Sequence, residues 1–243
     1  MLRVKQLHKW KVTYREAAAI QNSLRERIDF SPLRRSPKTV AGADVAYDKK
    51  TDVLFAAIVV IRLPSLEVIE ETVVEGKTSF PYIPGLLSFR EAPIVAKAFK
   101  QLTVSPDALI CDGQGIAHPR GFGLASHLGV LLDIPSVGCA KSRLIGTYRE
   151  PGPNRGNFTL LKREKSVSTD EITNSVYQPP ETIGAVVRTR AGVKPVFVSV
   201  GHRIDLRGAI RLVLRCCNGC RIPEPTRRAH ILVNTAKRTA RPF

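Results

Sequence analysis

The order of the apolar segments constrains the fold of this 243-residue chain more than any other feature of its sequence. Three β-like runs, 40–47, 54–62 and 68–74, follow one another with turns short enough for antiparallel pairing. Helix-forming segments then alternate with short apolar runs. This order predicts an α/β fold, a mixed β-sheet of three antiparallel strands and then parallel strands, flanked by helices.

The later elements are expected at the following positions: helices at 12–28, 90–102, 123–132 and 205–217, and strands at 108–112, 134–141, 182–190 and 194–202. The polar, Pro-rich stretch 150–181 predicts a loop or an inserted hairpin. We expect one domain over residues 1–234. Residues 235–243 have no core-forming pattern and are expected to be a disordered basic tail.

Composition excludes several classes of protein. No apolar run reaches 18 residues, so no membrane-spanning helix is expected. The start of the chain lacks the apolar region of a signal peptide. Five cysteines, an odd number, are typical of reduced thiols. We therefore expect a cytoplasmic protein, and we expect it to be a monomer.

The net charge of +17 is concentrated at the two ends of the chain. Residues 1–40 carry ten Lys/Arg against three Asp/Glu, and residues 201–243 carry ten against two. The middle of the chain is close to neutral. Like charge at this density opposes compactness unless it neutralises phosphates, so the pattern favours a nucleic-acid partner over a merely soluble basic surface.

Three carboxylates interrupt apolar segments where they are costly to bury. Asp44 lies inside a strand-like run, Asp112 ends one, and Glu91 shares a helical face with Ile94 and Val95. Each has an ordinary alternative: Asp44 pairing with a distant arginine, Asp112 making a strand-end turn, or Glu91 closing a capping box with Ser88. Against the capping box, Pro93 would then lie past the first helical turn. A shared divalent cation accounts for all three carboxylates together.

Oxygen ligands of this kind favour Mg²⁺, with Mn²⁺ as a substitute. On a basic protein, a carboxylate cluster that binds such a cation points to phosphodiester hydrolysis. The competing hypothesis, a basic protein that binds nucleic acid without cutting it, leaves the three carboxylates unexplained, because they repel phosphates when no metal is bound.

A glycine-rich loop follows Asp112 and includes Gly113 and Gly115. It lacks the third glycine of a dinucleotide-binding loop, so NAD or ATP binding is disfavoured. Bare backbone there allows a base to approach closely, and His118 is expected to shape the pocket. Tyr82 lies between two prolines in a stiff loop and is a candidate wedge for the gap left by an extruded base. An ordinary packed tyrosine is the alternative.

Taken together, several segments resemble the endonuclease V family of DNA repair nucleases: VAGADVAY, FPYIPGLLSFRE, CDGQGIAHPRGFGLASHLG, SVGCAKSRLIG, KPVFVSVGH and RIPEPTR. The resemblance runs from about residue 40 to residue 228. It implies a ribonuclease H-like fold and Mg²⁺-dependent nicking at the second phosphodiester bond 3′ to deoxyinosine, with 3′-hydroxyl and 5′-phosphate ends. Inosine-containing RNA is a further possible substrate, and DNA against RNA stays open.

The resemblance also implies roles for individual residues. Asp44 and Asp112 would hold the metal, and Glu91 would complete the carboxylate set. His202 would handle a proton or orient water, and Lys141 would lie near the scissile phosphate. The expected substrate contacts are a wedge of Tyr82 with Pro81 and Ile83, and a hypoxanthine pocket lined by Gly113, Gly115 and Gly123. Val200 departs from the proline that some members have before the histidine.

Two other interpretations stay open. Cys217 and Cys220 have the spacing of half a zinc site, but no second pair follows and His230 stands alone, which favours free thiols. A less specific nuclease or a resolvase of the same fold is the other enzyme hypothesis. His127 is expected to be a packed helix residue.

Overall fold

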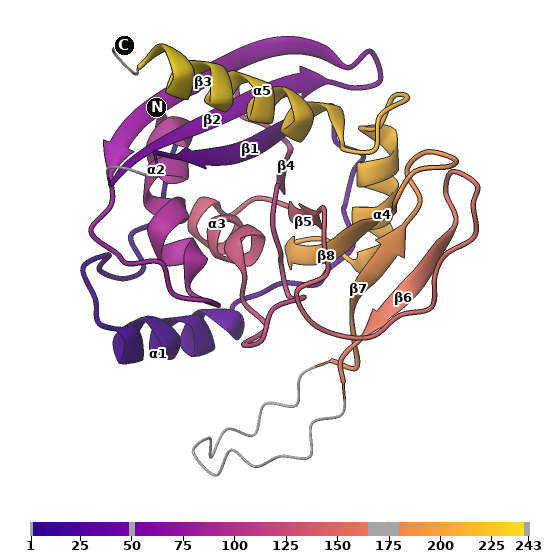
Figure 1. Cartoon of the computed structure of the whole chain (residues 1–243), viewed down its shortest axis with the longest axis horizontal. Coiled ribbons are helices and arrows are strands. Elements are labelled where there is room, and N and C mark those ends of the chain that lie inside the picture. The colour runs from indigo at the N-terminus through magenta and orange to yellow at the C-terminus, as the bar shows by residue number, and fades with distance from the viewer. Residues whose placement is uncertain (1, 49–51, 165–179, 241–243) are drawn as a thin grey trace.

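A computed structural model describes residues 2–48, 52–164 and 180–240 (Figure 1). An eight-stranded mixed sheet has the order β3-β2-β1-β4-β5-β8-β7-β6. The strands are β1 (Thr39–Tyr47), β2 (Val53–Arg62), β3 (Glu67–Lys77), β4 (Ala108–Cys111), β5 (Ser136–Ala140), β6 (Phe158–Lys162), β7 (Thr182–Val187) and β8 (Val196–His202). The helices are α1 (Tyr14–Arg25), α2 (Leu87–Gln101), α3 (Leu124–Leu132), α4 (Leu206–Arg215) and α5 (Glu224–Thr239).

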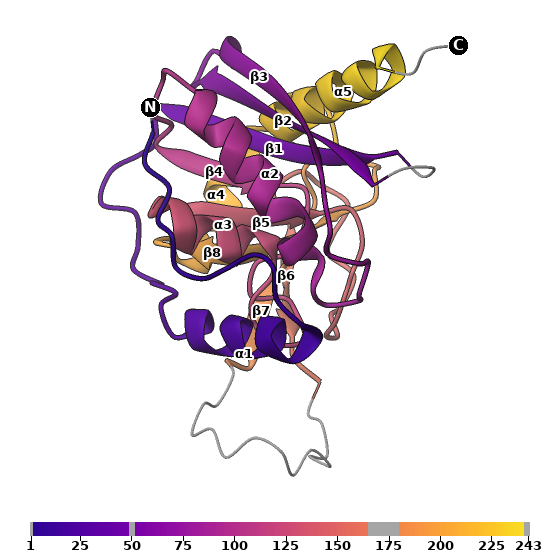
Figure 2. The same cartoon turned by 90° about the vertical axis from the view of Figure 1, so that its left-hand side faces the viewer.

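Helices cover both faces of the sheet. α2 and α3 lie on one face, while α4 and α5 lie on the other (Figure 2). The apolar side chains of both pairs pack on the sheet. The central strands are therefore buried on both sides, and β2 is buried from Leu54 to Ile61. This explains why their sequences are continuously apolar rather than alternating. No helix in the described part of the chain has the length and apolar character needed to span a membrane.

The predicted mixed sheet is confirmed, with its first three strands antiparallel and β4 and β5 parallel to β1. Of the two alternatives for the stretch 150–181, the structure supports the hairpin, because the edge strand β6 lies in this stretch and pairs antiparallel with β7. Residues 165–179 of the same stretch lie outside the described residues. The expected disordered tail is wrong for residues 235–239, because α5 continues through Thr239.

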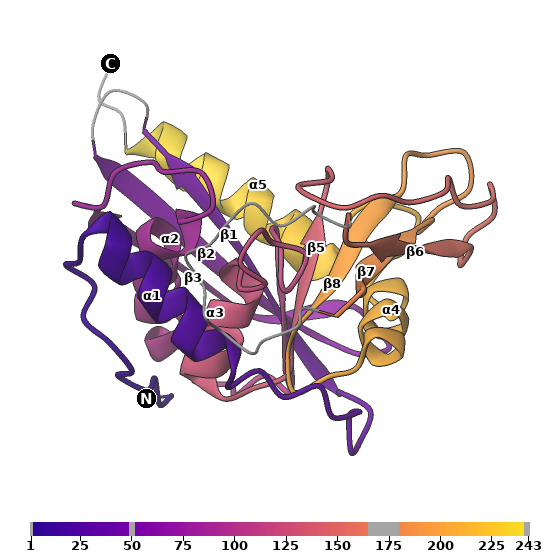
Figure 3. The ribbon, with the colours of Figure 1, turned by 90° about the horizontal axis from the view of Figure 1, so that it is seen from below.

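The first turn of α5 lies directly on β1 because Gly42 has no side chain. A Cβ atom at Gly42 would come within 2.2 Å of the carbonyl carbon of Pro225. Ala229 and Val233, on the same side of the helix, are fully buried. From this contact, α5 runs over β1 and β2 toward the β3 side of the sheet (Figure 3).

The ends of the central strands form two opposite edges of the sheet, and strand direction decides at which of the two a residue lies. The carboxyl ends of β4 and β5 lie at one edge, because these strands run parallel to β1. β8 runs antiparallel to β5, and its last residue, His202, pairs with Ser136 at the start of β5. Residues that follow β4 and β5 therefore lie at the opposite edge from residues that follow β8.

Candidate metal centre and adjoining pocket

Asp44 and Asp112 meet because β1 and β4 are parallel neighbours. Ala43 pairs with Cys111, so the two aspartates follow at the same height. The backbone N–H of Asp112 donates to the carbonyl of Ala43 at 3.2 Å, which fixes the carboxyl end of β4 against β1. Two carboxylates that the sequence places 68 residues apart thus share one point at the sheet edge.

His230, on α5, completes this group. Its Nδ1 lies 2.7 Å from Oδ2 of Asp44 and donates to that carboxylate. One ligand atom from each of Asp44, Asp112 and His230 lies within 4.8 Å of the other two. Two carboxylate oxygens and an imidazole nitrogen at this spacing form a candidate divalent-cation site.

The sequence analysis missed His230 because it was considered only as a zinc partner for cysteines. The signal that would have found it is a helix pattern after Pro223. Buried positions at Ala229, Val233 and the half-buried Ala236 recur at helical spacing and place His230 beside the packed face. All five cysteines are free thiols.

Glu91 approaches the two aspartates from α2, on the other face of the sheet. Its buried carboxylate accepts a hydrogen bond from the hydroxyl of Tyr47. The capping-box alternative is wrong, because the residue preceding α2 is Leu86 and no side chain caps the helix. Pro93 is tolerated past the first turn, since it lies inside α2. Glu91 is close enough to interact with both aspartates but is not one of the three clustered ligands.

Burial makes this carboxylate cluster hard to ionise. Desolvation, and then the negative charge of Asp112, raise the pKa of Asp44 above its ordinary value. Desolvation is also the largest cause that raises the pKa of Glu91 to about 8, and Asp44 and Asp112 add to it. A bound cation would remove this penalty, because it stabilises the ionised carboxylates.

Lys141 lies beside the candidate metal centre. It directly follows β5, and its ammonium forms an ion pair with Oδ2 of Asp112. The lysine side chain is partly exposed, so it stands at the mouth of the site rather than beneath it.

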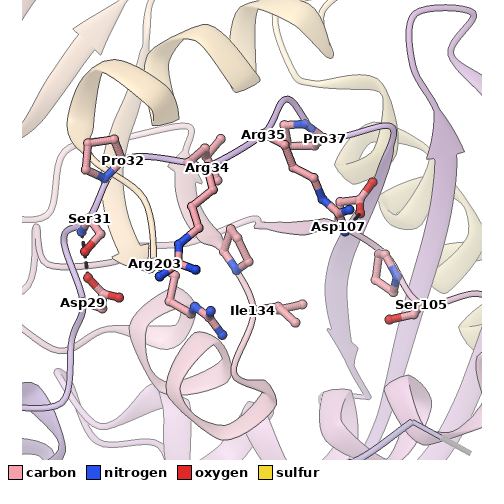
Figure 4. A pocket seen from close by; sticks show the side chains of 13 residues that line it. Asp29, Ser31, Pro32, Arg34, Arg35, Pro37, Ser105, Asp107, Ile134 and Arg203 are labelled. Atoms are coloured by element: carbon pink, nitrogen blue, oxygen red, sulfur yellow. Dashed lines mark hydrogen bonds and ion pairs between the residues drawn. The ribbon is translucent and has the colours of Figure 1, made fainter.

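His202 is not at this site, and its expected role is wrong. The antiparallel direction of β8 carries it to the opposite edge of the sheet, where its Nδ1 accepts from the backbone N–H of Asp29 at 3.2 Å. Its Nε2 lies 3.6 Å from Asp133. A cavity of about 450 Å³ lies at that edge. Its lining includes Arg34 and Arg203 together with Asp29 (Figure 4).

A pocket of about 400 Å³ opens beside the aspartates. It connects the candidate metal centre with the loop before α2 and the glycine-rich loop. Among the expected residues, its lining includes Tyr82, Ile83, Glu91, Asp112, Gly113, His118, Gly123 and Lys141. Tyr82 is 70% exposed, which contradicts the alternative of an ordinary packed tyrosine. Pro81 is exposed beside the pocket but does not line it.

Gly115 does not line the pocket, so its expected base contact is wrong. A Cβ atom there would lie 2.0 Å from the carbonyl oxygen of Val200, which shows that the glycine instead packs against the backbone of β8. Leu144, which sequence reasoning missed, lines the pocket and is 53% exposed.

The walls of the pocket are held by buried polar contacts. Gly85, whose φ is +77°, offers its carbonyl to the guanidinium of Arg120 at 2.6 Å and to the amide of Gln21 at 3.1 Å. His118 is buried, and burial, followed by the charge of Arg120, lowers its pKa to about 4. Its imidazole is therefore neutral at pH 7, and its Nδ1 accepts a hydrogen bond from the backbone N–H of Arg120. As expected, His127 is packed, and it is fully buried.

Comparisons with known proteins agree with this arrangement. A family model described as Endonuclease V matches residues 22–231. A relative of that name from Roseiflexus sp. (strain RS-1) is 47% identical, over 93% of this chain and 94% of that protein. The crystal structure of endonuclease V from Streptomyces avermitilis is 42% identical, with a TM-score of 0.85 and 99% of both chains covered.

Another similar structure is endonuclease V of Ciona intestinalis in complex with a 24mer DNA containing an inosine followed by a ribo-adenosine. It is 28% identical to this chain, with a TM-score of 0.76, and 93% of this chain and 98% of that chain are covered.

Fold and site together define a phosphodiester hydrolase with the ribonuclease H-like fold, a mixed sheet in which Asp44, inside β1, and Asp112, just after the neighbouring β4, bring two carboxylates together. Within that class the match extends over nearly the whole chain. The chain belongs to the endonuclease V family and is an endonuclease.

Proposed function

We propose that this endonuclease nicks DNA at the second phosphodiester bond 3′ to a deoxyinosine, leaves 3′-hydroxyl and 5′-phosphate ends, and does not remove the base. One observation carries the proposal: the group of Asp44, Asp112 and His230 adjoins a base-sized pocket with the exposed Tyr82 at its rim. The inosine-containing DNA bound by the Ciona intestinalis protein supports the choice of base.

The donor set fits a divalent cation. Asp44, Asp112 and His230 would hold Mg²⁺, or Mn²⁺ in its place, and Glu91 would complete the negative charge of the site from beneath. When bound, the cation would polarise the scissile phosphate and acidify a water molecule. A set with one imidazole is compatible with Mn²⁺ as well as with Mg²⁺, because imidazole binds transition metals.

His230 takes the role that the family resemblance gave to His202. Its Nδ1 donates to Asp44, so Nε2 is the ring nitrogen whose lone pair is free, and this one atom would either ligate the cation or exchange a proton, not both at once. The imidazole is about half exposed, so solvent protons can reach it. Lys141, at the mouth of the site, places a positive charge where a phosphate would approach Asp112.

The pocket would recognise the base through backbone and neutral groups. Tyr82, with Pro81 and Ile83 beside it, would fill the gap that the extruded base leaves in the stack. Gly113 and Gly123 present main chain to the pocket. His118 also lines it, and because its imidazole is uncharged, a neutral base can contact the ring without burying a charge. Both the cytoplasmic location and the monomeric state are part of the same proposal.

One assay tests the proposed function directly. Strands with a single inosine, made as DNA and as RNA, are incubated with Mg²⁺ or with a chelator, and the cut site is mapped. We expect one cut, at the second bond 3′ to the inosine, only when the metal is present. Equal cutting of an unmodified strand would instead identify a less specific nuclease, and binding without any cutting would identify the non-catalytic alternative. The RNA strand decides whether inosine-containing RNA is also a substrate.

A further inference from the structure

One face of α5 extends outward from the candidate metal centre. At 100° per residue, His230, Asn234 and Lys237 fall within about 60° of one another around the helix axis, with Arg238 beside them. The adjacent side of the helix, with Ala229 and Val233, is buried on β1 and β2. The polar face beside it, here called the α5 stripe, comprises His230, Asn234, Lys237 and Arg238, of which His230 and Arg238 are exposed and the other two are partly exposed.

The stripe is continuous with the site through Asn234. Its side-chain amide donates to the carbonyl of His230 at 2.8 Å, and the same nitrogen lies 3.4 Å from Nδ1 of that ring. A polar amide donor thus follows the imidazole by one helical turn, and two cations follow by a second turn.

The positive charge of α5 is balanced at its start and unbalanced at its end. Arg227 and Arg228 both form ion pairs with Glu224 at 2.7 Å. Lys237 has no such partner among the described residues, and the polar contact of Arg238 is the neutral hydroxyl of Thr235 at 3.3 Å. Two uncompensated cations therefore lie at the far end of a surface that begins at the candidate catalytic histidine.

We propose that the α5 stripe binds the sugar-phosphate backbone of the substrate strand beyond the cleaved bond. The inference rests on the proposed function and extends it to a second surface. From His230 to Lys237, the helix rises about 10 Å at 1.5 Å per residue. This length spans about three nucleotides of a stacked strand at 3.4 Å each. Phosphates bound there position a strand without reading its sequence.

Basic residues in the last turn have another possible role, which is to stabilise the helix through its dipole. That role predicts a change in thermal stability and no dependence on substrate length. The two explanations therefore differ in what a charge-removing substitution alters.

The test uses the double variant K237Q/R238Q, because glutamine retains good helix propensity while removing charge. The matched control is R207Q/R211Q, which removes two exposed arginines of α4. Single-turnover cutting of a single-inosine strand gives a half-saturating enzyme concentration and a maximal rate for each protein. The strand is used with long arms on both sides, and again with either arm shortened to the minimum that is still cut.

For K237Q/R238Q we expect the half-saturating concentration to rise about 10-fold with an unchanged maximal rate, and the effect to vanish when one particular arm is shortened. The slope of log affinity against log salt should fall by about 1.4, or 0.7 for each lost single-strand phosphate contact. The control pair should stay within about twofold of the wild type.

Equal effects of both pairs, an effect that ignores arm length, or a change confined to the melting temperature would overturn the proposal. If the wild type cuts no inosine strand, the proposed function fails first. The same comparison is then made by equilibrium binding of labelled strands. An equal affinity of K237Q/R238Q and the wild type in that measurement would overturn the proposal that the stripe binds the strand.

Discussion

At the scale of residues, the site is shaped by the cost of burying negative charge. Asp44 and Glu91 have raised pKa values because both are desolvated. Asp112 lies close enough to raise the pKa of each of them further. Such an arrangement is unfavourable without a compensating cation, which is why carboxylates inside apolar segments were informative in the sequence. The sequence did not show in the same way whether His202 or His230 belongs to the site, because that depends on the direction of β8 and on the position of α5.

Substitution of the two histidines should separate their roles. We expect His230→Ala to lower the maximal cutting rate by 100-fold or more, since it removes a group of the metal centre. By contrast, His202→Ala should retain the cutting rate and lower the melting temperature, because His202 is buried at the opposite edge. Single-turnover kinetics and thermal unfolding measure the two effects. The reverse pattern would return the proton-handling role to His202.

Tyr82 supports a second prediction at this scale. Its side chain is exposed and makes little packing contact, so Tyr82→Ala should leave the melting temperature unchanged. As a wedge, it should matter more when a base must leave a paired stack. We expect affinity for an inosine-containing duplex to fall about 10-fold and affinity for a single strand to fall much less. Equal losses for duplex and single strand would argue against the wedge.

At the scale of elements, apolar periodicity predicted β1 to β5, β7, β8 and helices α1 to α4, because their packed faces are strongly apolar. α5 was missed because the side chains that it buries deepest, Ala229 and Val233, are small and are surrounded by basic residues. Its basic end resembles a solvated tail. Its local signal, the helical spacing of Ala229, Val233 and Ala236, is weak because these side chains are small.

Gly42 permits a direct test of the docking of α5 on β1. Gly42→Ala places a methyl group within 2.2 Å of backbone in α5, so the helix must move away from β1. We expect a loss of about 1–3 kcal/mol in the free energy of unfolding. The cutting rate per folded molecule should also fall below that of the wild type, because His230 moves away from Asp44. Gly76→Ala is the matched control, since its Cβ would meet only a flexible methyl of Ile94 at 3.2 Å. Unchanged activity in folded Gly42→Ala would contradict the account.

The segment before α1 is fixed to α2 and α3 by two neutral histidines. Nδ1 of His8 donates to the carbonyl of Lys9, so its Nε2 accepts from Nε2 of His127 at 2.8 Å. Nδ1 of His127 then accepts from the hydroxyl of Ser88 at 3.0 Å. This order of donors requires both rings to be uncharged.

A pH dependence of stability follows from His127. Burial, and then the proximity of His8, hold its pKa well below 6.5 in the folded protein. The unfolded chain therefore takes up a proton first as the pH falls below about 6.5, and the folded state loses stability on acidification. The penalty of His127→Gln, measured by chemical unfolding, should shrink by roughly 1 kcal/mol between pH 6.5 and 5.5. A penalty that is constant with pH would contradict this. The comparison also cancels Glu91, whose raised pKa acts in the opposite direction.

At the scale of the whole molecule, the candidate active site lies at one edge of the sheet, and a buried structural contact lies at the opposite edge. The edge that follows β4 and β5 carries Asp112 and Lys141 and opens into the pocket, while the other edge buries His202. The positive charge predicted to attract nucleic acid is partly organised along α5, beside the acidic group. Net charge alone could not show this, because it does not reveal where the ends of the chain lie.

The most direct measurement combines metal binding with cutting in Asp112→Asn. Mn²⁺ binding by electron paramagnetic resonance, cleavage of a single-inosine strand in Mg²⁺, and affinity for that strand are measured together with the wild type. We predict that metal binding weakens and cutting is lost, while strand affinity is retained or improves because repulsion of the phosphates falls. Cutting at the wild-type rate by Asp112→Asn, with intact metal binding, would contradict the assignment of the centre.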